Sequence, residues 1–347
     1  MTLTVPHINA VATAVPPHLL HQSEVAARAG SVFTGRGFDR MRPVYAHAEI
    51  ATRHSCVPIE WYEQPHGFAE RNRLYIENAL DLLERAARDV LARTGLTARD
   101  VDGIVLASTT GIATPSLDAM LIDRLGLKRE VERLPIFGLG CAGGVLGLAR
   151  TAALAKARPG TRWLFLVVEL CGLTFRHGDQ SKSNVIATAL FGDGAAACLL
   201  SADPVGPAVA GWGEHTFEAS LDVMGWDVAD DGLKVVFSRD IPTLVRNDLG
   251  QLITGFLARQ GLGLGDIAEF CCHPGGAKVL DALEDVLQVQ RGGLVRSRDV
   301  LHRFGNMSAA TVLFVLADSL AAGADGWRLL TSMGPGFTTG FLLLGGG

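Results

Sequence analysis

Apolar residues recur along the chain with two spacings, which predict helices and strands that follow one another in turn. Residues 72–94 repeat apolar positions with the period of a helix, and Gly95 follows as a stop signal. Short apolar runs bounded by glycine or polar residues predict buried strands instead. The helices predicted in this way cover residues 72–94, 116–126, 142–157, 242–261, 277–289 and 308–321. The predicted strands cover residues 103–108, 134–138, 163–169, 195–200, 234–237, 268–272, 327–332 and 337–344. This alternation predicts a layered α/β architecture.

Two segments of the chain resemble each other and suggest that the fold contains a repeat. FGLGCAGGVLGLA (137–149) and FGNMSAATVLFVLA (304–317) both run from a Phe-Gly turn into a small-residue apolar helix. A strand that begins with tryptophan follows each of them. Chance likeness between two buried helices is the alternative, but the similar spacing favours duplication. The loop SADPVGP (201–207) is the natural boundary, so we expect α/β halves at residues 1–203 and 204–347.

Composition narrows the functional classes that the chain can belong to. The chain has 347 residues, of which 48% are hydrophobic, and a formal net charge of -5. This is enough for a large core. Because a nucleic-acid partner needs a concentrated basic surface and no Lys/Arg-rich run stands out, we expect no such partner. Neither a secretory signal nor an apolar stretch long enough to span a membrane is evident, so we expect a cytoplasmic protein.

The six cysteines are scattered along the chain, without a CxxC pair or a disulfide-like framework. In a cytosolic chain of this size they should be mostly reduced. Cys271, Cys272 and His273 could suggest a metal site. However, adjacent residues of a strand point to opposite faces, and no second pair of ligands exists. We therefore expect no metal site.

Cys141 lies between a predicted strand and a predicted helix, in a turn rich in glycine. Backbone N–H groups and the positive end of the helix would favour a thiolate at this place. The neighbouring glycines would let other atoms approach closely. Buried cysteines are more often inert, so the residue alone leaves a reactive and a structural role open.

Two further residues become candidates because they lie at turns next to predicted elements. His273 ends a predicted strand and precedes Pro-Gly-Gly, which is a suitable place for an active-site crevice. A lone histidine is nevertheless more often structural. Asn306 lies in Gly-Asn-Met-Ser at the start of a predicted helix, where a helix cap is the simpler role. Together with Cys141, a distant His and Asn form one known arrangement for acyl-thioester chemistry.

Five motifs together resemble those of the type III polyketide synthases, the chalcone synthase superfamily. They follow the order and spacing of that family, and the resemblance covers nearly the whole chain. The motifs are LGCAGG (139–144), ALFGDGAAACLL (189–200), HPGG (273–276), GNMSAATVLF (305–314) and MGPG (333–336). Ketoacyl-ACP synthase III and the hydroxymethylglutaryl-CoA synthases share the fold and the Cys/His/Asn logic. HPGG and GNMS followed by MGPG are closer to the polyketide group.

The resemblance implies a thiolase-like fold, in which two similar α/β halves form a layered αβαβα architecture, and a homodimer. It also implies a condensing acyltransferase. Cys141 is similar to the acylated nucleophile of the family. His273 and Asn306 resemble the pair that binds the thioester carbonyl and stabilises an enolate. Acyl-CoA and malonyl-CoA would be the substrates, and no metal or organic cofactor is implied.

Other positions resemble residues that line the acyl cavity or bind CoA in this family. Phe191 falls at the gatekeeper phenylalanine, and Val235 replaces a second gatekeeper phenylalanine of the plant enzymes. The remaining candidates are Thr109, the small residues Ala113 and Cys171, Met333 in place of a phenylalanine, and Arg53 as a CoA contact. These replacements resemble the bacterial branch that accepts fatty acyl starters and makes alkylpyrones or alkylresorcinols. Without the resemblance, the small residues could merely pack in a core and Arg53 could lie on the surface.

Two other functions stay open on the sequence alone. A ketoacyl-ACP synthase III-like condensing enzyme would use an acyl carrier protein, and a basic docking patch for this acidic partner is not evident. A non-catalytic acyl-binding protein on a degenerate thiolase fold would have lost a member of the triad, and all three residues are present.

Overall fold

The computed structural model describes residues 5–34, 36–237, 241–323 and 325–345. The helices are α1 (Gln22–Val32), α2 (Arg36–Met41), α3 (Pro43–Ala46), α4 (Phe68–Thr94), α5 (Leu117–Leu125), α6 (Gly143–Ala157), α7 (Lys182–Leu190), α8 (Ile241–Leu244), α9 (Gly250–Ala258), α10 (Ala277–Leu287), α11 (Val295–Phe304) and α12 (Thr311–Ala321). The strands are β1 (His7–Ala14), β2 (His18–His21), β3 (Thr52–Ser55), β4 (Gly103–Ala107), β5 (Glu132–Ile136), β6 (Trp163–Leu170), β7 (Asp193–Ser201), β8 (Val209–Thr216), β9 (Met224–Ala229), β10 (Gly232–Phe237), β11 (Ile267–Cys272), β12 (Trp327–Gly334) and β13 (Thr338–Leu344).

Two sheets carry the architecture, and they share one topology. The five-stranded sheet has the order β1-β7-β6-β4-β5, and the four-stranded sheet, counted from its other edge, has the order β8-β13-β12-β11. In both sheets the first two neighbouring pairs are antiparallel and the third pair is parallel. This common order supports the predicted duplication. The first sheet uses strands up to Ser201 and the second uses strands from Val209 onward, and the boundary at 203/204 stays a prediction.

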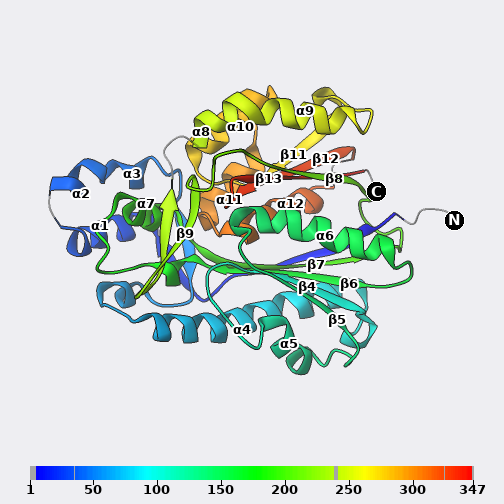
Figure 1. Cartoon of the computed structure of the whole chain (residues 1–347), viewed down its shortest axis with the longest axis horizontal. Coiled ribbons are helices and arrows are strands. Elements are labelled where there is room, and N and C mark those ends of the chain that lie inside the picture. The colour runs from blue at the N-terminus through cyan, green and yellow to red at the C-terminus, as the bar shows by residue number, and fades with distance from the viewer. Residues whose placement is uncertain (1–4, 35, 238–240, 324, 346–347) are drawn as a thin grey trace.

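The sheets and helices form five layers, as Figure 1 shows. Helices α4 and α5 cover one face of the five-stranded sheet, α6 and α12 lie between the two sheets, and α9 and α10 cover the four-stranded sheet. The three largest groups of buried hydrophobic residues occupy these interfaces. The expected thiolase-like αβαβα fold is thus present. Among the described residues, no helix combines the length and apolarity that crossing a membrane requires.

Helices α6 and α12 lie close together because glycine allows it. A Cβ added to Gly144 in α6 would lie 2.2 Å from the carbonyl oxygen of Ala309, in the turn that leads into α12. No side chain fits at that distance. The small-residue pattern that the sequence shows in both segments therefore brings together the two loops that carry Cys141 and Asn306.

Most of the predicted elements are found, with shifted ends. The first long helix begins at Phe68 rather than at residue 72, and Gly95 ends it with a positive φ of 69°. The helix predicted over 242–261 is found as a continuous helical segment that ends at Ala258 and contains one π-helical turn, Val245–Leu249, between α8 and α9. The hydrophobic pattern did not predict several elements, which are β1, β2, β3, β8, β9, α1, α2, α3, α7 and α11. Several of these surround the cavity described below.

Candidate active site

Cys141 lies in a 3₁₀ turn, Gly140–Ala142, that leads directly into α6. The loop after β12 packs against this turn, since a Cβ on Gly140 would lie 2.5 Å from the Pro335 side chain. The Cys141 thiol donates a hydrogen bond to Ser308 Oγ at 3.5 Å. Burial, the largest cause, raises the pKa of the Cys141 thiol to about 12, so the resting residue is a thiol. This is opposite to the thiolate that we expected from the start of the helix.

His273 follows β11 at the edge of the four-stranded sheet. Its backbone N–H donates to Thr331 O at 2.8 Å, which extends the pairing with β12 by one residue. The side chain is 5% exposed, and neither ring nitrogen has a hydrogen-bond partner among the described residues. Burial lowers the pKa of His273 to about 4, so the imidazole is neutral at pH 7. A neutral imidazole offers one acceptor and one donor to a substrate.

Asn306 connects the His273 loop to the Cys141 loop. Its side-chain amide donates to Gly275 O at 3.2 Å, two residues after His273. Its Oδ1 atom accepts from the backbone N–H of Ser308 at 2.8 Å. The bond from Ser308 N closes a local turn, which is the kind of structural role that a helix cap would also give Asn306. Because the amide nitrogen carries two N–H groups, one remains for a substrate.

Ser308 links the three candidate residues. Its Oγ accepts from Cys141, its backbone N–H donates to Asn306, and its hydroxyl donates to Glu169 Oε1 at 3.4 Å. Ser308 has a positive φ of 47°, a strained conformation for a residue other than glycine. Cys141, Asn306 and the loop of His273 are thus joined in one network.

Glu169 is a buried acid beneath this network that the sequence analysis did not single out. It is fully buried near the end of β6 and also accepts hydrogen bonds from Thr109 N at 3.0 Å and Thr110 Oγ1 at 2.9 Å. Burial raises the pKa of Glu169 to about 7, and these hydrogen bonds oppose that rise. A single acid in the apolar strand WLFLVVE was the signal that could have identified it.

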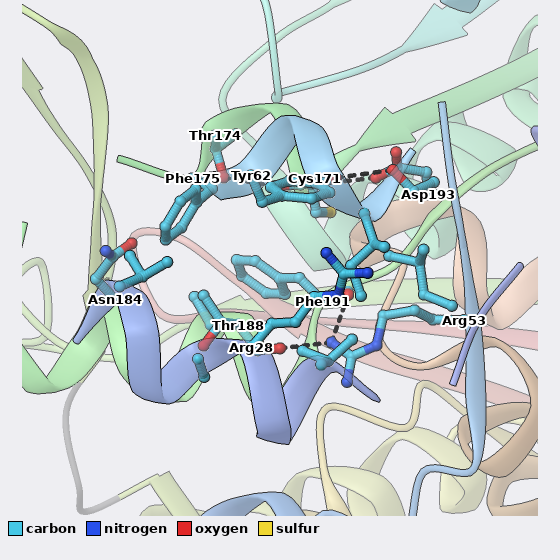
Figure 2. A pocket seen from close by; sticks show the side chains of 18 of the residues that line it. Arg28, Arg53, Tyr62, Cys171, Thr174, Phe175, Asn184, Thr188, Phe191 and Asp193 are labelled. Carbon is cyan, nitrogen blue, oxygen red and sulfur yellow. Dashed lines mark hydrogen bonds between the residues drawn. The ribbon is translucent and has the colours of Figure 1, made fainter. Parts of the chain in front are cut away.

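An apolar cavity of about 800 Å³, its open mouth included, lies next to this network. Cys171 and Val235 line one part, and the apolar side of α1, with Val25 and Ala29, lines another. Figure 2 shows the side chains around it, including Phe191, Phe175 and Tyr62. At the edge of the cavity, Arg28 forms ion pairs with Glu24, Glu60 and Glu63. The mostly apolar lining of this cavity suits an apolar group.

The predicted cavity residues separate into two groups. Phe191, Cys171 and Val235 all line the cavity. The other three are not among the described residues that line it. Thr109 donates through its backbone to Glu169 and accepts from Gly140 N at 3.2 Å. Ala113 packs against the hydrophobic cluster that includes residues of α4, and Met333 belongs to the cluster that includes residues of α9 and α10.

Arg53 does not fit the predicted role as a CoA contact. The side chain is 3% exposed, and its guanidinium donates to the carbonyl oxygens of Thr188, Ala189 and Phe191. Although Arg53 lines the cavity, a phosphate would have to displace these carbonyl groups from its guanidinium. The correction follows from the short strand β3, which turns Arg53 inward, and which the sequence analysis missed.

The described residues contain no group of three or more His, Cys, Asp and Glu side chains placed to hold a metal ion. Cys271 and Cys272 are both fully buried, and each contributes to a different hydrophobic cluster. This is the opposite-face arrangement that the sequence analysis expected for neighbours on a strand.

Comparison with protein families and curated proteins gives a consistent result. Residues 40–204 match the N-terminal domain of chalcone and stilbene synthases, and residues 216–346 match the C-terminal domain. A 1,3,6,8-tetrahydroxynaphthalene synthase of Streptomyces peucetius is 40% identical, over 97% of this chain and 92% of that protein. A putative chalcone synthase of Bacillus subtilis is 38% identical over 97% of both chains. The alpha-pyrone synthesis protein Pks18 of Mycobacterium tuberculosis is 29% identical, over 96% of this chain and 90% of that protein.

A solved structure agrees with these relatives. The 1,3,6,8-tetrahydroxynaphthalene synthase of Streptomyces coelicolor, a bacterial type III polyketide synthase, superimposes with a TM-score of 0.92 at 26% identity. The match covers 98% of this chain and 99% of that one. With both domains of the family matched, the chain belongs to the chalcone and stilbene synthase family and is a type III polyketide synthase, a condensing acyltransferase.

Proposed function

We propose that this synthase condenses malonyl-CoA onto a fatty acyl starter held on Cys141 and releases an alkylpyrone or an alkylresorcinol. The observation that carries the proposal is the apolar cavity beside Cys171 and Val235. Acyl-CoA and malonyl-CoA are the substrates in this proposal, and the enzyme acts as a cytoplasmic homodimer.

The first half-reaction loads the starter. Because the resting Cys141 is a thiol and His273 is a neutral base, His273 removes the thiol proton as the sulfur attacks the thioester carbonyl of acyl-CoA. The C–S bond to CoA breaks, and the proton on His273 passes to the leaving CoA thiolate. Cys141 then carries the acyl group as a thioester, and His273 is neutral again.

The second half-reaction extends the chain. Malonyl-CoA binds with its thioester oxygen facing an N–H of His273 and an N–H of Asn306. Loss of CO₂ leaves the electron pair as an enolate, and these two donors stabilise its oxygen. The enolate carbon attacks the thioester on Cys141, and the extended chain leaves on CoA. Further cycles give a poly-β-ketone that cyclises.

The cavity supports a fatty acyl starter because burial of methylene groups contributes binding energy. Each buried methylene contributes up to about 0.8 kcal/mol, and the entropy cost of ordering the chain removes part of this gain. A difference of about 1.4 kcal/mol already gives a tenfold preference for a longer chain. Cys171, at 2% exposure, adds little bulk at a place where a larger residue would close the cavity.

The test compares kcat/KM for hexanoyl-CoA and longer acyl-CoA starters in the native enzyme, in Cys171→Phe and in the matched control Cys171→Ala. The native enzyme and the Ala variant should prefer the longer starter by about tenfold or more. The Phe variant should lose that preference and retain its activity with hexanoyl-CoA. A native preference for a short or aromatic starter, or an unchanged preference in the Phe variant, would contradict the proposal.

The similarity to two 1,3,6,8-tetrahydroxynaphthalene synthases supports a second candidate function. A tetrahydroxynaphthalene has no alkyl tail, so its synthesis needs no long starter. Incubation with malonyl-CoA alone, followed by mass spectrometry, distinguishes the two functions. Release of a tetrahydroxynaphthalene as the main product would favour the second candidate. If no aromatic product forms without an acyl-CoA starter, the result would favour the synthase with a fatty acyl starter.

A further inference from the structure

Strand β3 and the residue before it contact the ends of α11 and α7, the two helices that lead to Asn306 and Phe191. The backbone N–H of Ala51, just before β3, donates to His302 O, and Thr52 Oγ1 donates to Arg303 O, both at 2.8 Å. These carbonyls lie in the last turn of α11, which ends just before Gly305 and Asn306. The next residue of β3, Arg53, binds the end of α7, which is followed by Phe191.

The guanidinium of Arg53 binds the last carbonyl groups of α7. Its Nη1 atom donates to Thr188 O at 2.7 Å and to Phe191 O at 3.0 Å, and its Nη2 atom donates to Ala189 O at 3.1 Å. The last four carbonyl groups of a helix have no partner within the helix, and a cation stabilises that end. Figure 2 shows the Arg53 side chain reaching toward Thr188 and Phe191. Arg53 thus fixes the backbone where α7 ends and Phe191 begins.

The stem of Arg53 lies against two glycines that flank Phe191 and Asn306. A Cβ added to Gly192 would lie 3.3 Å from Arg53 Cβ, and one added to Gly305 would lie 3.6 Å from it. Gly192 follows Phe191, and Gly305 precedes Asn306. The Phe191 and Asn306 backbones pair directly, with Gly192 N donating to Asn306 O at 3.0 Å. Arg53 therefore contacts both sides of the pairing.

We propose that Arg53 is a positioning residue, which holds Phe191 against Asn306 and so sets the direction of the Asn306 amide in the decarboxylation step. Arg53 touches no reacting atom in this account. The proposal rests on the role of Asn306 given under the proposed function. In place of the predicted contact with CoA, Arg53 acts on Asn306 through the paired backbones of Phe191 and Asn306.

The test uses Arg53→Lys and Arg53→Met, and measures two half-reactions of each enzyme. Decarboxylation is measured with malonyl-CoA and with malonyl-N-acetylcysteamine, which lacks the phosphates of CoA. Acylation of Cys141 by an acyl-CoA starter is measured in single turnover, and all rates are normalised to the Cys141 that iodoacetamide can alkylate. Arg328→Lys is the matched control, because Arg328 is also buried, binds Ser319, and belongs to β12 in the four-stranded sheet.

Both Arg53 variants should lose decarboxylation by about tenfold or more, since each lost hydrogen bond to a charged group weakens the positioning. Arg53→Lys retains the charge and should lose less than Arg53→Met, and it carries the test if the Met variant does not fold. The loss should be equal for the two malonyl thioesters, while acylation of Cys141 changes by no more than about threefold. Arg328→Lys should leave the ratio of the two half-reactions unchanged.

Three results would overturn the positioning role. A loss with malonyl-CoA that is absent with malonyl-N-acetylcysteamine would restore the contact with CoA phosphates. Equal losses of acylation and decarboxylation would leave Arg53 a purely structural role, as would normal rates for both variants. Asn306→Ala is measured in parallel. If Asn306→Ala decarboxylates malonyl-CoA normally, the proposed role of Asn306 is wrong. If Asn306→Ala loses decarboxylation and Arg53→Lys keeps it, only the proposed role of Arg53 is wrong.

Discussion

Phe191 and Asn306 lie opposite each other in an isolated parallel β-bridge. Asn306 N donates to Leu190 O at 2.8 Å, and Asn306 O accepts from Gly192 N at 3.0 Å. One residue lines the cavity and the other carries the amide proposed to bind the enolate oxygen. The wall of the cavity and the catalytic group therefore share one piece of backbone, and a substitution on one side is expected to affect the other.

The two half-reactions should separate in single variants. Cys141→Ala keeps His273 and Asn306 intact, so it should still decarboxylate malonyl-CoA while making no polyketide. Asn306→Ala removes the enolate donor and should lower decarboxylation by about two to three orders of magnitude. Release of CO₂ from labelled malonyl-CoA measures both rates. If Asn306→Ala decarboxylates normally, the residue only orders the turn at Ser308.

A larger side chain on α1 should shorten the preferred starter. Ala29 lines the cavity and is 6% exposed, so Ala29→Phe would fill space that a long acyl chain needs. We expect the optimum of kcat/KM to move to shorter acyl-CoA starters, with hexanoyl-CoA activity within about threefold of the native value. Ala27→Phe is the control, because Ala27 is exposed on the same helix. Equal chain-length profiles for native enzyme and Ala29→Phe would show that the chain does not reach α1.

Glu169 should make stability depend on pH. Its folded-state pKa is raised to about 7 by burial, above the unfolded value near 4.5, so its contribution is present at low pH and lost as pH rises through 7. The loss between about pH 5 and 8 amounts to up to about 3 kcal/mol. Glu169→Gln has no charge to bury, so its free energy of unfolding should rise relative to the native enzyme as pH increases. Urea unfolding at several pH values measures this difference, and a constant difference would contradict the buried acid.

The motifs and the hydrophobic periods predicted the layered fold, whereas the catalytic roles of the triad residues stay a prediction. Cys141, His273 and Asn306 each follow or precede a strongly patterned element, so the topology brings their loops together. The N-terminal region was missed because β2 and β3 are four residues each, too short for a period to be visible.

The error on Arg53 has the same origin. Because no strand was predicted around Arg53, its side chain was expected to lie on the surface. Only the pairing of β3 with β2 shows that this side chain points inward to the end of α7. The expected thiolate at Cys141 failed for a different reason. The helix start favours negative charge, but burial of the thiol opposes it more strongly, and the sequence alone does not give the depth of a side chain.

The central claim is that Cys141 alone carries the growing acyl group. Incubation of the enzyme with an acyl-CoA starter, without malonyl-CoA, followed by proteolysis and mass spectrometry, tests it directly. We expect one acyl adduct, on the peptide that contains Cys141, and none in Cys141→Ala. A stable adduct on Cys171, Cys271 or Cys272 in the native enzyme would contradict the claim.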